Sequence, residues 1–230
     1  MILVVRLLLL ITASIYLCPY LFAAPSYGTK LPEKGKFFGG FQIHVIFKRY
    51  LENEFGSLRS NQEFFQLSYG IFDWLSLDLK AGSGLIKQHP LNSSEIDYPS
   101  SFAGGYGIRV KFYDTEKVKA VFGFQHISVH PRSVRLNAGQ KNRAILDDWQ
   151  VSLLASYALG GFTPYLGVKW SRVDYIHWVE EDRKRRMSDL TQDLGVVFGF
   201  DLPLYENTWL NIEGQLIDTQ AFSFSFNFKF

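Results

Sequence analysis

The segment AFSFSFNFKF, residues 221–230, decides the fold because it alternates with a period of two up to its last residue. Five phenylalanines occupy every second position: Phe222, Phe224, Phe226, Phe228 and Phe230. The residues between them are polar: Ser223, Ser225, Asn227 and Lys229. Successive side chains of a β-strand point to opposite faces, so this segment predicts a strand with one aromatic face and one polar face.

The same period recurs along most of the chain after residue 35, and no segment carries a convincing helical stripe. Apolar residues alternate with Gly, Ser, Gln or charged residues in nine further segments. These segments are 41–47, 65–71, 75–81, 106–112, 120–124, 149–157, 166–170, 194–200 and 210–216. With the terminal segment the pattern predicts ten strands, and eight or twelve would also fit it.

The connections between these segments alternate in length. Tight turns are expected at 73–74, 114–118, 160–161 and 205–207, and longer polar loops at 51–62, 87–101, 130–147 and 178–189, with a short last one at 218–220. Short turns at one rim and long loops at the other are typical of outer-membrane barrels. A β-sandwich would also alternate, but its polar face would meet water. We expect a single antiparallel transmembrane β-barrel of the bacterial outer membrane.

The N-terminus has the pattern of a secretory signal. Arg6 precedes an apolar stretch, and Ala23 and Ala24 supply small residues for cleavage; a retained membrane helix is the alternative. We expect a signal peptide at 1–24, a short periplasmic segment at 25–35 and the barrel at 36–230, with both termini periplasmic. Cys18 is the only cysteine, so the mature chain would have no disulfide.

The balance of 24 Lys and Arg against 22 Asp and Glu gives no global charge that would recruit nucleic acid. The sequence also contains no metal-ligand spacing and no phosphate-binding loop. We therefore expect no metal, no cofactor and no nucleic-acid partner.

One stretch resembles a known family. FTPYLGVKWSR (162–172), within the segment 147–173, resembles a strand of the chlamydial major outer membrane protein, a porin family. Segments 102–114, 69–84 and 217–230 resemble other parts of that family in the same order. The resemblance implies an outer-membrane porin that passes small solutes. The chain departs from the family in its shorter length and in its lack of mature cysteines, so a cross-linked structural role is not implied.

The polar faces of the predicted strands would line the lumen. The charged or titratable residues of this set are His44, Lys48, Asp78, Lys80, Arg109, Lys111, Lys169, Asp193, Glu213 and Lys229. Ten strands lie nearer the filled than the open end of barrel sizes. Two interpretations follow: a narrow pore with weak anion preference, or a structural or surface-interaction barrel plugged by salt bridges that does not conduct.

A third interpretation concerns the loop end of the strand at 120–124. His126 and Ser128 share the parity of Phe122 and Phe124 and would face lipid, a placement that resembles the His-x-Ser pair of outer-membrane lipid A deacylases. Asp147 or Asp148 would orient the imidazole. Val129 follows Ser128, where those enzymes carry Asn, so a rim hydrolase is the weakest hypothesis.

The most charged loop is EEDRKRR, residues 180–186. Arg183, Lys184, Arg185 and Arg186 are candidates for contact with lipopolysaccharide phosphates, because guanidinium groups match phosphate geometry; a merely solvated loop is the alternative. The terminal phenylalanines, 222 to 230, resemble the C-terminal signal read by the barrel-assembly machinery. Partners expected are thus membrane lipid, lipopolysaccharide, the assembly machinery and small solutes, with homo-oligomer formation left open.

Overall fold

The computed structural model describes residues 28–52, 55–136, 139–187 and 192–230. Its described residues form twelve strands, and no helix among them is long and apolar enough to cross a membrane. The strands are β1 (Phe37–Tyr50), β2 (Ser57–Phe72), β3 (Leu75–His89), β4 (Ile96–Asp114), β5 (Val118–Val129), β6 (Val134–Arg135), β7 (Lys141–Tyr157), β8 (Thr163–Val179), β9 (Asp182–Met187), β10 (Leu194–Tyr205), β11 (Thr208–Leu216) and β12 (Gln220–Lys229). The predicted signal at 1–24 lies outside the described residues.

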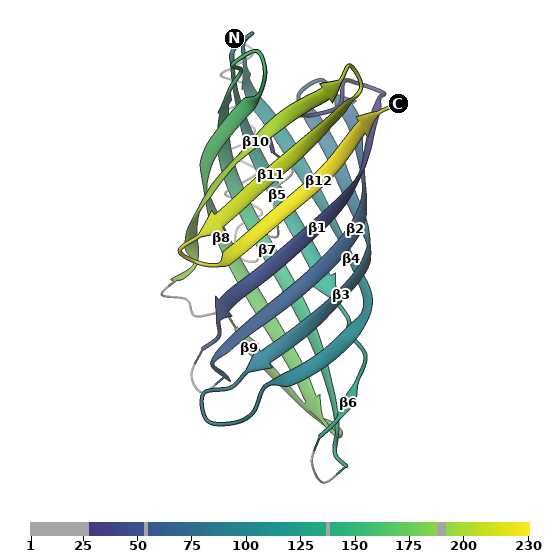
Figure 1. The fold of residues 1–230 in the computed structure, drawn as a ribbon, viewed down its shortest axis with the longest axis vertical. Helices are drawn as coiled ribbons and strands as arrows, with labels where there is room; N and C mark the ends of the chain where they lie inside the picture. The colour runs from purple at the N-terminus through teal and green to yellow at the C-terminus, as the bar shows by residue number, and fades with distance from the viewer. Residues whose placement is uncertain (1–27, 53–54, 137–138, 188–191) are drawn as a thin grey trace.

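Ten of these strands close into an antiparallel barrel (Figure 1). Neighbours pair in the order β1-β2-β3-β4-β5-β7-β8-β10-β11-β12, and β12 returns to β1. The closing seam runs from Phe38 opposite Lys229 to Val45 opposite Phe222. The predicted barrel and its ten strands are confirmed, and the pairing of β12 with β1 closes the sheet.

The predicted turns at 73–74, 114–118, 160–161 and 205–207 lie at one rim, here the turn rim, together with the end of β12. The opposite rim, here the loop rim, is reached by strands that run farther than predicted. β2 begins at Ser57 and β3 ends at His89, inside segments expected to be loops.

Two short strands lengthen the barrel wall at the loop rim. β6 pairs with the start of β7, and β9 pairs with the end of β8, so these ends of β7 and β8 project beyond the neighbouring strands toward the lower end of Figure 1. The prediction that 130–147 and 178–189 are loops was therefore wrong. An edge strand in water tolerates charge on both faces. Because residues 180–186 are charged at every position, they show no alternation of apolar and polar residues that would predict a strand.

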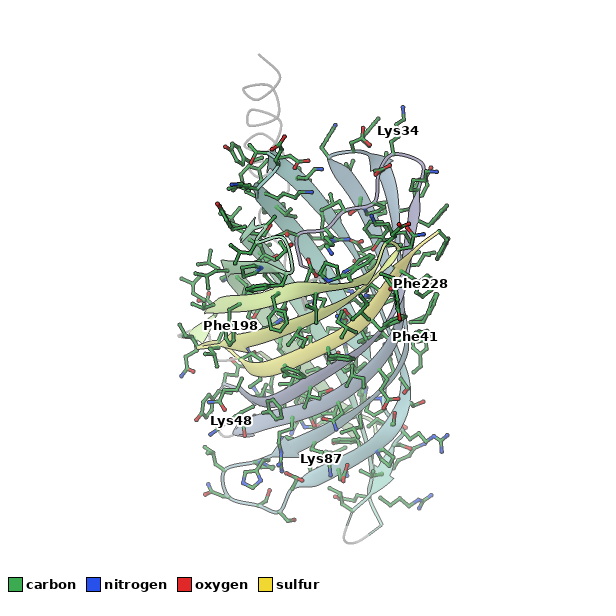
Figure 2. The ribbon with its side chains drawn as sticks, turned by 45° about the horizontal axis from the view of Figure 1, so that its top comes forward. Lys34, Phe41, Lys48, Lys87, Phe198 and Phe228 are labelled. Carbon is green, nitrogen blue, oxygen red and sulfur yellow. The ribbon has the colours of Figure 1, made fainter. Side chains whose placement is uncertain are left out.

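The barrel's outer face is an apolar belt. Phe41, Leu166 and Phe198 are 61%, 61% and 44% exposed, and Figure 2 labels Phe41 and Phe198 on the wall. Their strand neighbours Gln42 and Lys169 are buried inside. On β12 the aromatic residues face out and Ser223, Ser225 and Asn227 face in. Apolar residues out and polar residues in is the alternation of a barrel in lipid.

The interior is divided into two parts. Toward the turn rim it holds polar and charged side chains, whereas toward the loop rim it holds an apolar cluster. The most buried members of that cluster are Ile46, Leu58, Ile86, Tyr98, Ile127, Val129, Leu146, Val173 and Tyr175, each at most 1% exposed. The prediction of a polar lumen therefore holds only in part for this half of the barrel, where the apolar cluster lies beside the buried polar residues Ser60, Gln62 and Gln88.

Candidate functional site

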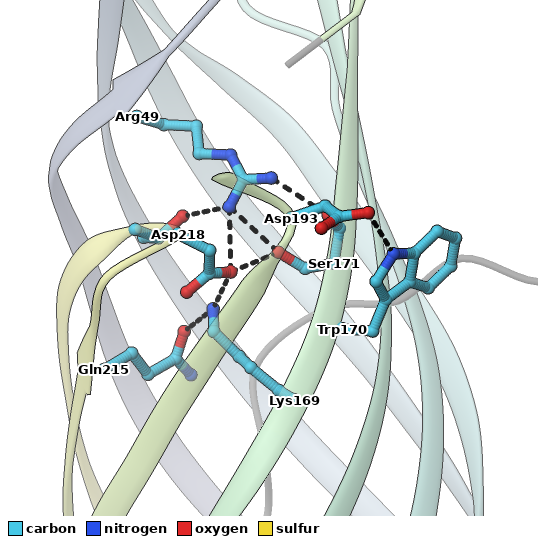
Figure 3. Close-up of polar contacts among 8 residues, drawn as sticks. Arg49, Lys169, Trp170, Ser171, Asp193, Gln215 and Asp218 are labelled. Carbon is cyan, nitrogen blue, oxygen red and sulfur yellow. Dashed lines mark hydrogen bonds and ion pairs between the residues drawn. The ribbon is translucent and has the colours of Figure 1, made fainter. Parts of the chain in front are cut away.

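The centre of the lumen holds a buried cluster around Arg49 (Figure 3). Arg49 Nη1 donates hydrogen bonds to Asp218 Oδ2 (2.8 Å), Ser171 Oγ (2.9 Å) and Thr219 Oγ1 (2.9 Å). Its Nη2 donates to the carbonyl oxygen of Ser171 (2.9 Å). The Arg49 and Asp218 side chains are 1% and 0% exposed, so this buried pair joins β1 to the turn before its neighbour β12.

A second cation enters the same cluster from β8. Lys169 Nζ lies 2.9 Å from Asp218 Oδ2 and donates to Gln215 Oε1 at 2.7 Å. One carboxylate oxygen, Asp218 Oδ2, therefore faces two buried cations, Arg49 and Lys169, and also accepts a hydrogen bond from Ser171 Oγ (Figure 3). Buried charges need partners of this kind because desolvation is costly.

The Asp218 side chain is turned inward by its backbone. Ile217, the preceding residue, has φ +81° and is 65% exposed. Gly195 on β10 leaves room for the carboxylate, since a Cβ built there would lie 1.9 Å from Asp218 Oδ1. A strained turn and a missing side chain together place this acid in the lumen.

Sequence reasoning missed Arg49 and selected Lys48 in its place. The register of β1 shifts between Ile46 and the residues that follow, which is a β-bulge. A bulge adds one residue and reverses the facing beyond it. Lys48 therefore does not line the lumen: its Nζ lies 4.4 Å from the centroid of the exposed Tyr50 ring. Alternation alone carries no sign of the bulge.

A second ion pair lies nearer the turn rim. Arg109 Nε and Nη2 donate to the two oxygens of Asp78, each at 2.9 Å, with both side chains buried. Arg109 Nη1 donates to the carbonyl oxygen of Lys30 at 2.6 Å, and Thr29 Oγ1 donates to Ser156 Oγ at 2.8 Å. Residues 29 and 30, expected in a periplasmic segment, thus enter the lumen. Burial lowers the pKa of the Lys30 ammonium, and Asp201 opposes that shift.

Three more of the predicted lumen residues are buried inside the barrel. His44 Nδ1 lies 2.7 Å from Ser223 Oγ across the closing seam. Lys80 donates to Gln42 Oε1 at 2.6 Å. Glu213 accepts a hydrogen bond from the Tyr165 hydroxyl at 2.9 Å. Each is at most 4% exposed, so these side chains fill the interior.

The remaining predicted lumen residues lie at the rims. Lys111 pairs with Asp114, and Lys229 is exposed; both line a cavity of about 580 Å³ at the turn rim together with Lys30, Lys36 and Lys119. Asp193 is half-buried and accepts a hydrogen bond from the Trp170 indole at 2.6 Å. Lys111, Lys229 and Asp193 therefore do not lie in the central lumen.

Two candidate hydrolase residues, His126 and Ser128, lie on the outer wall beside Asp147, whereas Asp148 does not. Ser128 pairs in register with Asp147 on β7, whereas Asp148 pairs with the inward Ile127. Ser128 Oγ donates to Asp147 Oδ1 and lies 2.8 Å from His130 Nε2. Asp148 is therefore excluded from the cluster, and His130, which sequence reasoning did not choose, contacts the hydroxyl.

This cluster lacks the connectivity of a catalytic triad. In a triad one imidazole contacts both the hydroxyl and the carboxylate. Here His126 Nε2 lies 3.5 Å from Asp147 and stacks on Trp149 at 3.8 Å between ring centroids, while His130 contacts Ser128. Asp147 binds the hydroxyl directly, so no histidine is held between acid and serine.

The four basic residues expected in one loop lie instead on strand β9 and are divided between its faces. Arg183 pairs in register with Trp178 and Arg185 with Ile176, whereas Lys184 pairs with His177 and Arg186 with the buried Tyr175. Arg183 and Arg185 therefore share the outer face, and Lys184 and Arg186 the inner one.

The described fold defines an integral outer-membrane β-barrel: a closed sheet with an apolar outer belt and polar rims. Comparison with known proteins indicates the family. The model of the Chlamydia major outer membrane protein matches residues 134–185, from β6 into β9. The match covers 52 of the 230 residues and shows similarity to that family over this part of the chain.

The sequence relatives are porins. The chain is 55% identical over 38 residues to the major outer membrane porin, serovar A, of Chlamydia trachomatis, and 53% identical over the same length to the serovar E protein. The aligned stretch is 16% of this chain and spans only 10% of the length of each relative. The predicted resemblance to this family is thus confirmed.

Three solved structures with related shapes are distant in sequence. An outer membrane channel from Pseudomonas putida F1 has a TM-score of 0.48 at 10% identity and covers 90% of this chain and 100% of its own. Ail of Yersinia pestis gives 0.42 at 9% identity, covering 86% and 99%. The protease OmpT of Escherichia coli gives 0.40 at 12% identity, covering 85% and 95%. Scores at this level assign no function.

Proposed function

We propose that this chain is an integral outer-membrane barrel of the porin type whose lumen is closed to solutes in its resting state. The observation that carries the proposal is the apolar cluster inside the loop-side half of the barrel. Water and ions follow a path lined by polar groups, and a dry apolar layer opposes both.

Two charged layers support the same conclusion. Beside the apolar cluster, Asp218 binds both Arg49 and Lys169, and nearer the turn rim Arg109 binds Asp78 and the backbone of Lys30. Solutes would have to separate buried ion pairs at two levels. This agrees with the expectation that barrels of about eight to ten strands are filled by side chains.

The orientation belongs to the same proposal. We place the turn rim and both termini in the periplasm and the loop rim outside the cell, because bacterial barrels carry short turns on the periplasmic side and longer extracellular loops. The projecting loop-rim ends of β7 and β8, together with β6 and β9, would then be presented outside.

Conductance of the purified barrel in planar bilayers tests the proposal. Wild type should stay silent at protein loads that give many insertions, with insertion scored by a heat-dependent gel shift. Replacing Tyr98 and Tyr175 together by serine should open small steps, since their hydroxyls contact each other at 3.3 Å in the middle of the apolar cluster. The matched control is the double phenylalanine variant, which keeps the volume and should stay silent.

A small-solute channel is the second candidate, favoured by the similarity of residues 134–185 to porins. It predicts steady, small steps from wild type without strong ion selectivity, because the buried cations Arg49, Lys80, Arg109 and Lys169 are balanced by the buried acids Asp78, Asp201, Glu213 and Asp218. Such steps would overturn the closed-lumen proposal.

A further inference from the structure

The outer wall toward the loop rim changes from aromatic to basic along β7, β8 and β9. Tyr106, His126 and Trp149 stand side by side in register on β4, β5 and β7, and Arg172 follows on β8. Aromatic side chains in such a row form the girdle at a membrane surface. Residues farther along the same face therefore lie above the hydrocarbon.

The first basic feature is a row of three residues. Arg143, Trp178 and Arg183 are neighbours in register on β7, β8 and β9. Both guanidinium groups lie 5.5 Å from the Trp178 ring centroid. Among the described residues no carboxylate lies within ion-pair distance of Arg143 or Arg183. The indole thus holds two guanidinium groups through cation–π contact.

The second feature lies between this row and the girdle. Arg172 and Arg185 both bind Asp174, with Arg172 Nη2 at 3.1 Å from its carboxylate. Asp147 is the next acid on this wall, in register with Asp174. Four guanidinium groups therefore face two carboxylates, and a net positive charge remains.

The residues of this face lie at increasing heights above the girdle. Arg143 is six residues from Trp149 along β7, which is about 20 Å of strand and, at a tilt of about 45°, roughly 14 Å above the girdle. Phosphates at the surface of an outer leaflet lie at or just above the hydrocarbon edge. Arg172 and Arg185 lie nearest that edge, and Arg143 and Arg183 lie farther out in the polar region.

We propose that this face, defined by Arg143, Arg172, Trp178, Arg183 and Arg185, binds the phosphate groups of lipopolysaccharide in the surrounding outer leaflet. Guanidinium forks bind phosphate oxygens in pairs, and the face stands directly over the lipid-exposed belt. The inference does not depend on whether the lumen conducts. The proposal involves only two of the four cations of β9, because only Arg183 and Arg185 lie on this face.

The test is binding of purified lipopolysaccharide to the detergent-solubilised barrel, measured as lipopolysaccharide sugar retained per barrel over a concentration series. R143Q/R183Q should bind at least about tenfold more weakly, because the loss of even one charge-assisted contact has an effect of that size. The control K36Q/K184Q removes the same charge, one lysine from the turn rim and one from the inner face of β9, and should bind like wild type. Dephosphorylated lipopolysaccharide should bind wild type as weakly as the variant binds the native lipid.

The outcomes separate the alternatives. Equal binding by R143Q/R183Q and wild type, an equal loss in the control, or undiminished binding of the dephosphorylated lipid would each overturn the proposal. Displacement of the lipid by millimolar inorganic phosphate would also overturn it, by indicating a site for free phosphate. Should R143Q/R183Q lose its heat-dependent gel shift, R143K/R183K replaces it; this variant keeps the charge, loses the forks and must bind at least about threefold more weakly.

Discussion

Asp218 is the residue on which the lumen network converges. Its carboxylate faces Arg49 and Lys169 in a space closed to water. Asp218→Asn should destabilise the barrel by about 3–5 kcal/mol, because it leaves two buried cations against a neutral amide. The measurement is the urea concentration at half-unfolding in lipid vesicles.

A matched control separates charge from packing. The triple variant R49M/K169M/D218L removes all three charges at similar volume, and buried ion pairs replaced in this way often cost little stability. It should unfold within about 2 kcal/mol of wild type. If D218N were as stable as wild type, the network would not contribute to the stability of the barrel.

Ile217 carries the strain that turns Asp218 inward. A β-branched residue at φ +81° is unfavourable by about 1–2 kcal/mol. Ile217→Gly should therefore raise the stability by about 1 kcal/mol, seen as a higher urea midpoint. The control is Leu216→Gly, at the last position of β11, where the strand backbone gains nothing from glycine and the midpoint should fall. A lower midpoint for I217G would show that the turn is not strained.

Substitution of Ser128 tests whether the outer-wall cluster is catalytic. Because no imidazole joins Asp147 to the Ser128 hydroxyl, purified barrel mixed with lipopolysaccharide should release no more fatty acid than Ser128→Ala. Free fatty acid is quantified by mass spectrometry. Release that depends on Ser128 would instead show that the two histidines rearrange into a working site.

At the scale of elements, β12 is the strand whose pairing closes the molecule. It bonds to β1 and β11 along nearly its whole length. Ser225→Pro removes a backbone donor from this ladder, so the barrel should fail to show its heat-dependent gel shift. Ser225→Ala keeps the backbone donor and should fold. A folded S225P barrel would mean that the seam tolerates an open edge.

Alternation was sufficient to predict the ten barrel strands and the turn rim, because side-chain facing follows directly from a period of two. It could not predict Arg49, since the bulge after Ile46 leaves no mark in composition. Leu58 and Leu146 were also missed, because segments expected to be loops continue as strands and carry apolar side chains inward. The chemistry of the lumen therefore had to come from the structure.

At the scale of the molecule, the proposed orientation can be checked with an epitope. Inserted between Asn92 and Ser93, in the connection from β3 to β4, it should be accessible to antibody on intact cells. Inserted between Gly160 and Gly161, at the turn rim, it should become accessible only after the outer membrane is permeabilised. The reverse pattern would place the termini outside.

The strands differ in length around the barrel. β10, β11 and β12 have 12, 9 and 10 residues, whereas β7 and β8 have 17 each and are lengthened further by β6 and β9. About nine to eleven residues are what a tilted strand needs to cross the hydrocarbon, so one flank barely clears the bilayer while the other stands above it. In atomic force topographs of a reconstituted membrane, each molecule would appear as a ridge displaced from the barrel centre. The direction of this displacement would show how the barrel is rotated about the membrane normal.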